Sequence, residues 1–332
     1  MSSLLRTRVL ALCVAALLLA SCGTEETGSS VPPVTTPETT SLPPTTSSEA
    51  VLSTLLTELL PVLDPHPPVI DAPSPITALG EDLFAELDNT ATDWWYDRVK
   101  SDQLGTGYRP APNAITELLP RYNGIWQYPD PNEPVLFMTM NCGHEYNGQT
   151  ARILDIVTEK GVPTAFFLNG QFIVNAPDTV RRMTAEGHIV ANHGMHHRMA
   201  PEVLAAEGVQ AMLEDMEELA SFYHRETGLP ISHYVRPPSG RFSERVLALY
   251  DAAGYRTVFW DIAHVDWLID NQPDPAKALA QLVGELHNGA VIILHPVGSS
   301  NVVLLPSLID QARAAGYRFA SLDEFPETHI QP

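Results

Sequence analysis

The chain has 332 residues, of which 44% are hydrophobic and 18% are charged, a composition that suits one large globular domain or two small ones. Its formal net charge is -21. This excess of acidic groups disfavours nucleic-acid binding and adsorption to anionic lipid, because both depend on Lys and Arg.

The first 21 residues are typical of a bacterial lipoprotein signal peptide. Arg6 and Arg8 precede an apolar stretch from Val9 to Ala20, which is short for a membrane span of about 20 residues. The stretch ends in LASCG at residues 19–23, which resembles a lipobox. We therefore expect cleavage before Cys22 and lipidation of its thiol, which would anchor an extracytoplasmic protein to the cell membrane. A secretory signal without lipid is the alternative.

Two segments follow before the main domain. After Cys22, the residues up to 50 are rich in Thr, Ser and Pro, which predicts a disordered tether. Residues 51–92 contain short amphipathic pieces around a Pro-rich run and predict a weakly structured pre-domain region. Seven Trp and Tyr residues then occur between positions 94 and 128. Their rings either form a sugar-stacking surface or cover the end of the domain that follows.

Residues 93–332 predict an incomplete, distorted (β/α)7 barrel. Seven β-branched and aromatic runs alternate with helix-period segments, which is the pattern of parallel strands joined by helices. The predicted strands are Val135–Met140, Thr164–Asn169, Ile189–His193, Tyr234–Arg236, Arg256–Asp261, Ala290–His295 and Tyr317–Ser321. The predicted helices are Thr150–Lys160, Thr179–Glu186, Pro201–Glu226, Glu244–Ala253, Ala276–Leu286 and Leu304–Ala314.

Working residues of such barrels lie at the C-terminal ends of strands, and polar residues occur there in this chain. They are Asn141, Cys142, His193, Arg236, Asp266 and His295. His193 and His197 are four residues apart, which on a helical turn places both imidazoles on one side, where they can share a divalent metal. A polar surface loop is the alternative for this run of histidines.

Two further patterns indicate acid–base chemistry. Arg236 is followed by a rigid Pro-Pro turn and favours the orientation of an acid or a substrate. An Asp266–His295 pair would fix the tautomer of His295 and let the ring act as a general acid. For His295 the alternative is a core histidine satisfied by a backbone carbonyl.

Together these motifs resemble the polysaccharide deacetylase family, carbohydrate esterase family 4. In chain order they are TMNCG at 139–143, HGMHH at 193–197, RPPSG at 236–240, Asp266-Trp267 and Leu294-His295. GHEYNG at 143–148 and Ser321-Leu322-Asp323 resemble the subgroup that deacetylates muramic acid in peptidoglycan and leads to the δ-lactam. The resemblance implies metal-dependent de-N-acetylation of a cell-wall polysaccharide at the outer face of the cytoplasmic membrane.

The resemblance also assigns roles to residues. It makes His193 and His197 ligands of a divalent metal, which we expect to be zinc. It makes His295, supported by Asp266, the general acid, and it places Arg236 against the catalytic base. It implies substrate contacts at Ser239, whose backbone N–H would hold the oxyanion, at Trp267, and at Arg241, which would meet a lactyl carboxylate. We expect a monomer whose partners are peptidoglycan and, through its lipid, the membrane.

The chain departs from the family at its first motif, which ordinarily supplies two acids. Asn141 and Cys142 stand there instead, and losing a positioned acid–base group typically lowers the rate about 10²–10⁴-fold. As a thiolate, Cys142 would complete a zinc site with the two histidines, and His144 or Glu145 would then act as the base. Cys142 as a small buried residue is the other interpretation.

Two other functions compete with the enzyme. The first is a catalytically silent lipoprotein of the same fold that binds glycan without turnover, because Asn141 and Cys142 replace the acids of the first motif. The second is an accessory binding lipoprotein for transport, which is disfavoured because such proteins usually have two lobes and only one barrel is predicted.

Overall fold

The computed structural model describes residues 79–94 and 117–327. Four predicted features lie outside the described residues: the signal peptide, the lipidation of Cys22, the tether and the first part of the pre-domain region. Within the described ranges, no helix combines the length and the apolar character that crossing a bilayer requires.

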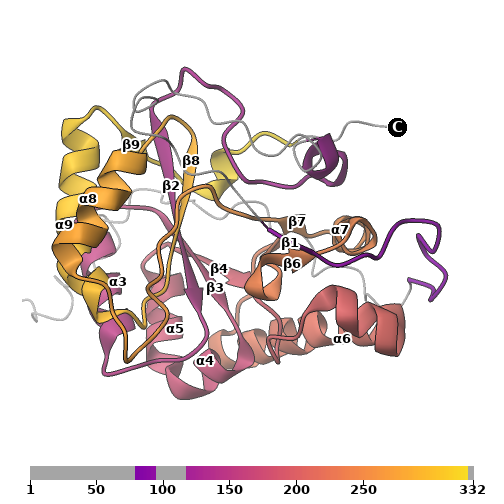
Figure 1. The fold of residues 1–332 in the computed structure, drawn as a ribbon. Helices are drawn as coiled ribbons and strands as arrows, with labels where there is room; N and C mark the ends of the chain where they lie inside the picture. Colours follow the sequence, from indigo (N-terminus) through magenta and orange to yellow (C-terminus); the bar gives the residue numbers. More distant parts are fainter. Residues whose placement is uncertain (1–78, 95–116, 328–332) are drawn as a thin grey trace, which may run out of the picture. The chain divides into compact units, whose positions relative to one another are not determined.

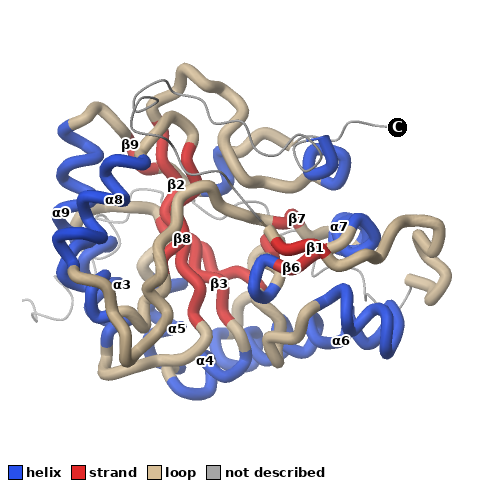
Figure 2. Tube along the Cα trace, in the orientation of Figure 1, coloured by secondary structure: helices blue, strands red, loops and turns tan. Residues whose placement is uncertain are grey.

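A parallel sheet of seven strands organises the domain (Figures 1 and 2). Its order is β7-β5-β4-β3-β2-β8, and β9 pairs with the first residues of β2. The strands are β2 Val135–Cys142, β3 Thr164–Leu168, β4 Ile189–Asn192, β5 Tyr234–Val235, β7 Arg256–Thr257, β8 Ala290–Leu294 and β9 Arg318–Phe319. Parallel strands need crossover connections, usually helices, so the predicted alternation accounts for this sheet.

The helices form a layer that follows the order of the strands. They are α3 Gln149–Glu159, α4 Gly170–Asn175, α5 Pro177–Ala185, α6 Ala200–Thr227, α7 Glu244–Ala252, α8 Pro275–Glu285 and α9 Ser299–Ala314. Neighbouring helices are in contact along the series α8, α9, α3, α5, α6, α7, and Figure 1 shows this layer wrapping around the sheet. The predicted incomplete (β/α) barrel is confirmed. Helix α4 was not predicted from the sequence.

The distortion of the barrel lies between β7 and β8. Strand β7 ends at Thr257, four residues earlier than predicted. Beyond it, isolated bridges join Val258 to Ile125 and Ile262 to Ile292. The chain between β7 and β8 is therefore held by single contacts instead of a continuous ladder, and the barrel stays incomplete.

The alternation of β2 decides which of its side chains reach the inner face of the sheet. Successive residues of a strand point to opposite faces. One set of β2 side chains packs in the core between the sheet and the helices: Leu136, Met138, Met140 and Cys142. Val135 and Phe137 pack in the core on the other face. Thr139 and Asn141 continue this second set toward the C-terminal end of the strand.

Residues 79–94 pack against α6 and α7. Leu79, Leu83 and Phe84 contact the hydrophobic cluster between these helices. Strand β1, Thr92–Asp93, pairs antiparallel with β6, Arg241–Phe242. The described part of the predicted pre-domain region therefore shares the hydrophobic core of the main domain.

The described aromatic rings that precede β2 are packing residues. Trp94 stacks on Phe259 with ring centroids 4.4 Å apart. It donates from Nε1 to the Trp260 carbonyl at 2.7 Å. Three more rings pack on core clusters: Tyr122, Trp126 and Tyr128. For these four rings the structure favours the covering role over a sugar-stacking surface, and the other three lie outside the described residues.

Helix α6 consists of two helical pieces. Gly208 interrupts the helical backbone with φ 93° and ψ -179°. The Glu81 carboxylate accepts the backbone N–H of Val209 at 2.7 Å and that of Gln210 at 3.1 Å. An acidic cap satisfies free N–H groups and complements the helix dipole. A segment remote in sequence therefore fixes where the second piece of α6 begins.

Candidate active site

Four strands bring polar side chains to one edge of the sheet. Asn141 lies at the end of β2, His193 follows β4, Arg236 follows β5 and His295 follows β8. Because the strands are parallel, their C-terminal ends meet at the same edge, where barrels of this type carry their working residues. The structure thus brings together residues that lie up to 154 positions apart in the sequence.

Arg236 connects the strands around it. It is fully buried. Its Nη1 donates to Asn141 Oδ1 at 2.9 Å, and its Nη2 donates to Thr139 Oγ1 at 2.9 Å. Its Nε donates to the Val258 carbonyl at 3.0 Å, and the guanidinium lies 4.1 Å from the centroid of the Phe167 ring. These acceptors are neutral oxygens, and burial lowers the pKa of Arg236 well below its usual value.

Asn141 occupies the position at which the family resemblance places a general base. Its amide oxygen accepts the hydrogen bond from Arg236. An amide oxygen can accept a hydrogen bond, but an amide does not take up a proton near neutral pH. The position therefore keeps the contact that an acid would make with Arg236 and has no basic group.

Cys142 does not join the two histidines. Its side chain is fully buried in the core between the sheet and the helices, together with Met140 and Leu168. No three His, Cys, Asp or Glu side chains within the described residues form a metal-binding group. Burial raises the pKa of the Cys142 thiol well above its usual value, and Glu145 raises it further. The thiolate that zinc binding requires is therefore disfavoured.

We expect Cys142→Ala to leave metal binding unchanged and to lower the free energy of unfolding by about 1 kcal/mol, as is usual for a small loss of buried volume. Thermal denaturation and metal analysis of the purified variant check both parts. Loss of bound metal from Cys142→Ala would instead make the thiol a ligand and would contradict its placement in the core.

His193 and His197 lie on a loop, whereas their spacing predicts a helical turn. Gly194 and His197 have φ values of 75° and 54°, which are left-handed and do not occur within an α-helix. The two imidazole centroids are nevertheless 4.9 Å apart. His193 Nδ1 lies 2.7 Å from the Arg236 carbonyl oxygen. A carbonyl oxygen can only accept, so Nδ1 carries the proton and Nε2 keeps its lone pair.

The two imidazoles fit a divalent transition metal at two coordination positions. Burial, and next to it His197, lowers the pKa of His193 well below its usual value. Desolvation lowers the pKa of His197 as well. Both rings are thus neutral near pH 7, which is the form that binds metal, and imidazole nitrogen suits zinc. The remaining positions would be left to water and substrate.

His295 and Asp266 form a close pair. His295 Nδ1 lies 2.7 Å from Asp266 Oδ1, and the backbone N–H of His295 donates to Asp266 Oδ2 at 2.7 Å. Because the carboxylate accepts, Nδ1 carries the proton and Nε2 is the ring atom that can serve a substrate. Asp266 is fully buried, while the His295 side chain is 21% exposed. This geometry suits a histidine acid held by a carboxylate.

Asn301 supports this pair and is not among the site residues expected from the sequence. From α9 it donates through Nδ2 to Asp266 Oδ2 at 2.6 Å and to the His295 carbonyl at 2.9 Å. Its Oδ1 lies 3.1 Å from His264 Nε2. Gln272 donates to the Asp266 carbonyl at 2.8 Å. These contacts fix the Asp266 carboxylate that orients His295. No local sequence motif indicates the contact from Asn301 on α9.

An apolar surface adjoins His295. Trp267 is 48% exposed, and the centroid of its ring lies 5.4 Å from that of the His295 ring. Val265 and Leu268 are also exposed. An exposed indole beside the acid suits the apolar face of a sugar ring. Ser239 is exposed on the turn that follows Arg236 and has a left-handed φ of 57°.

Arg241 is engaged in two ion pairs. Its Nη1 lies 2.7 Å from Asp93 Oδ1, and its Nε contacts the Glu202 carboxylate. The guanidinium is therefore already paired where the sequence analysis assigns it to a substrate carboxylate. A lactyl group could reach it only in exchange for one of these two side chains.

Comparisons with known proteins agree with this geometry. A family model described as polysaccharide deacetylase matches residues 128–258. The peptidoglycan-N-acetylmuramic acid deacetylase PdaA of Bacillus subtilis is 33% identical over 236 residues, which are 71% of this chain and 86% of that protein. The structure of PdaA, described as a family 4 carbohydrate esterase, matches with a TM-score of 0.66 at 30% identity over 72% of this chain and 98% of that one. An uncharacterized 30.6 kDa protein of Geobacillus stearothermophilus is 37% identical over 72% of this chain and 87% of its own length.

Proposed function

The chain belongs to the polysaccharide deacetylase family, the family 4 carbohydrate esterases, and from this premise we propose that it removes N-acetyl groups from the muramic acid of peptidoglycan. The observation that carries the proposal is the placement of two neutral imidazoles, His193 and His197, and of the His295–Asp266 pair at one edge of the sheet. Hydrolysis of an acetamide needs an electrophilic centre and a positioned acid, and these are the side chains that can supply both.

Each side chain has a definite task in this reaction. A divalent metal held by His193 and His197 would supply Lewis-acid chemistry, which polarises a carbonyl and eases the ionisation of water. The protonated His295 would give the proton on Nε2 to the departing amine nitrogen. Asp266 keeps Nδ1 protonated and stabilises the imidazolium. The backbone N–H near Ser239 would donate to the oxyanion that develops from the acetyl oxygen.

The absence of a base at position 141 sets the expected rate. Asn141 cannot take a proton from water, so we expect turnover to be slower than with an acid at this position. His144 and Glu145 follow β2 on the same loop and are the proposed proton acceptors. Both Glu145 carboxylate oxygens are shielded from solvent and have no hydrogen-bond partner within the described residues.

Muramic acid is proposed as the sugar because the matched PdaA acts, by its name, on N-acetylmuramic acid in peptidoglycan. The lactyl carboxylate of muramic acid is a group that an Arg can bind through two parallel hydrogen bonds. Arg241 would make this contact after exchange of Asp93 or Glu202 for the substrate. Trp267 would pack on the sugar beside His295.

Zinc is the metal that we propose, because two imidazoles are its common ligands. We also propose that the protein is a monomer at the outer face of the cytoplasmic membrane, held there by lipid on Cys22. The lipobox-like letters at residues 19–23 support this location. A silent glycan-binding role receives less support, because PdaA, which matches most of the chain, is named as a deacetylase.

The proposed function is tested by product analysis. The full-length chain, purified without chelator, is incubated with peptidoglycan and Zn²⁺. The glycan is then digested to muropeptides, which are identified by mass spectrometry. We expect loss of acetyl groups from muramic acid and from no other sugar. Loss from glucosamine alone would contradict the muramic acid assignment, and an unchanged glycan would contradict the hydrolase itself.

A further inference from the structure

The loop that carries His193 and His197 is fixed to helix α6. Asn192 accepts the Gly194 N–H through Oδ1 at 2.9 Å and donates through Nδ2 to the Met216 carbonyl at 2.9 Å. The Met195 N–H donates to the Asp215 carbonyl at 3.2 Å. Asn192 and Met195 lie on either side of His193 and Gly194. Both are thus hydrogen-bonded to adjacent residues of α6, Met216 and Asp215.

The Asp215 side chain contacts the residue before His197. Its Oδ1 accepts the backbone N–H of His196 at 3.2 Å. A Cβ at Gly194, where φ is 75°, would lie only 2.7 Å from Asp215 Oδ2. The carboxylate therefore packs directly on the backbone between the two histidines, in a position that only glycine can face.

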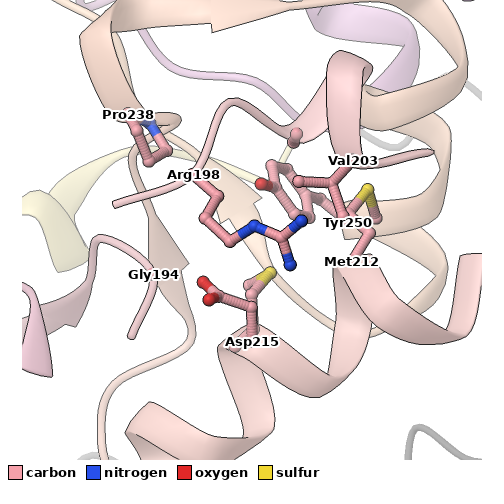
Figure 3. Close-up of a pocket in the computed structure, with 9 residues that line it drawn as sticks. Gly194, Arg198, Val203, Met212, Asp215, Pro238 and Tyr250 are labelled. Atoms are coloured by element: carbon pink, nitrogen blue, oxygen red, sulfur yellow. The ribbon is translucent and has the colours of Figure 1, made fainter. Parts of the chain in front are cut away.

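Figure 3 shows how Asp215 is held. Its carboxylate points toward Gly194, and the Arg198 guanidinium lies beside it. Tyr250 lies behind, in the same small hollow. Burial raises the pKa of Asp215, so this side chain carries a desolvation cost at its place. A half-buried acceptor on α6 that faces left-handed backbone at Gly194 and His197 is a feature expected where loop geometry matters.

We propose that Asp215 is a positioning residue for the metal-binding loop. By accepting the His196 N–H, it fixes the backbone that gives His197 its left-handed φ of 54°. It thereby keeps the His197 ring near His193. This inference rests on the proposed function, because it concerns a loop that we assign to metal binding. Outer residues that orient metal ligands typically change metal affinity about 10–100-fold when they are removed.

The test uses the full-length chain and three variants. Asp215→Ala removes the acceptor. Asp215→Asn keeps an acceptor oxygen without the charge. Glu214→Ala removes an exposed carboxylate from the adjacent position of α6 and is the matched control. Binding of Co²⁺ is followed by its absorption spectrum, and hydrogen exchange of residues 193–198 is measured in the metal-free protein.

We expect Asp215→Ala to bind Co²⁺ about 10–100-fold more weakly and to exchange the His196 amide faster, since only that amide loses its acceptor. Asp215→Asn should restore both properties, and Glu214→Ala should match the native chain. The inference would be overturned if Asp215→Ala had the amide exchange rates of the native chain. It would also be overturned if Asp215→Asn exchanged as fast as Asp215→Ala. If the native chain itself binds no Co²⁺, the proposed function fails, while the exchange measurement still decides whether Asp215 holds the loop.

Discussion

Replacement of His295 by alanine is expected to lower kcat for acetate release by about 10²–10⁴-fold, the usual contribution of a positioned general acid. KM should change little, because proton donation to the leaving nitrogen occurs only in the transition state. The fold should survive the change, since Asp266 keeps its hydrogen bonds from Asn301 and from the backbone N–H of residue 295. Steady-state kinetics on peptidoglycan measures both constants.

Two further variants, at the control residue His224 and at Asp266, make this test specific. His224 is exposed near the end of α6, and His224→Ala should leave kcat unchanged. Asp266→Asn should lower kcat, because the imidazolium of His295 loses the carboxylate that stabilises it. If His295→Ala raises KM and leaves kcat unchanged, then His295 only binds substrate and the leaving amine takes its proton elsewhere.

Replacement of Asn141 by aspartate is expected to raise kcat by about 10²–10⁴-fold, because it supplies the missing proton acceptor. Asn141 Oδ1 already accepts from Arg236 at 2.9 Å, so the new carboxylate would form an ion pair without any change of side-chain shape. The thermal midpoint should rise too. Within the described residues, no carboxylate contacts the buried guanidinium, and a buried charge is stabilised by a partner of opposite sign.

Asn141→Ala separates the two effects of this change. It removes the hydrogen bond to Arg236 without adding a base, so it should lower the thermal midpoint and leave the rate near the native one. If Asn141→Asp has the native rate, then the proton of water is accepted by another group, and position 141 has only a structural role. If acetate appears only with Asn141→Asp, then the native chain binds glycan silently.

Much of the fold follows from the sequence because its signals are local. Runs such as Ala290–Leu294 are apolar and buried on both faces, as the strands of a parallel sheet usually are. Their alternation with helix-period segments gives the strand order in the chain and places the polar strand ends at one edge. The short helix α4 was missed because its capping residue, Asn169, was assigned to the preceding strand.

The orientation of the first motif could not be decided from the sequence. Asn141 and Cys142 are the last two residues of β2, where the regular alternation of side chains can end, so their spacing alone does not decide whether both face the site. In the structure Asn141 accepts from Arg236, and Cys142 points into the core between the sheet and the helices. The expected zinc site with a cysteine ligand is disfavoured by this orientation, because the thiol is fully buried.

Other parts of the site depend on contacts that no local pattern contains. Asn301 reaches Asp266 across 35 residues and Asp215 reaches His196 across 19. The two ion pairs of Arg241 join segments that are 148 and 39 residues apart. Such contacts arise from the packing of helices on the sheet, and a single sequence does not reveal them.

The most direct test of the account is a metal titration of the chelator-treated, full-length chain, with acetate release from peptidoglycan as the signal. We predict that the native chain is inactive without metal and regains activity as Zn²⁺ is added. His193→Ala and His197→Ala should not respond at the same concentrations. Acetate release by the native chain that does not depend on added Zn²⁺ would contradict hydrolysis at these two imidazoles. Full recovery of acetate release in His193→Ala would contradict it as well.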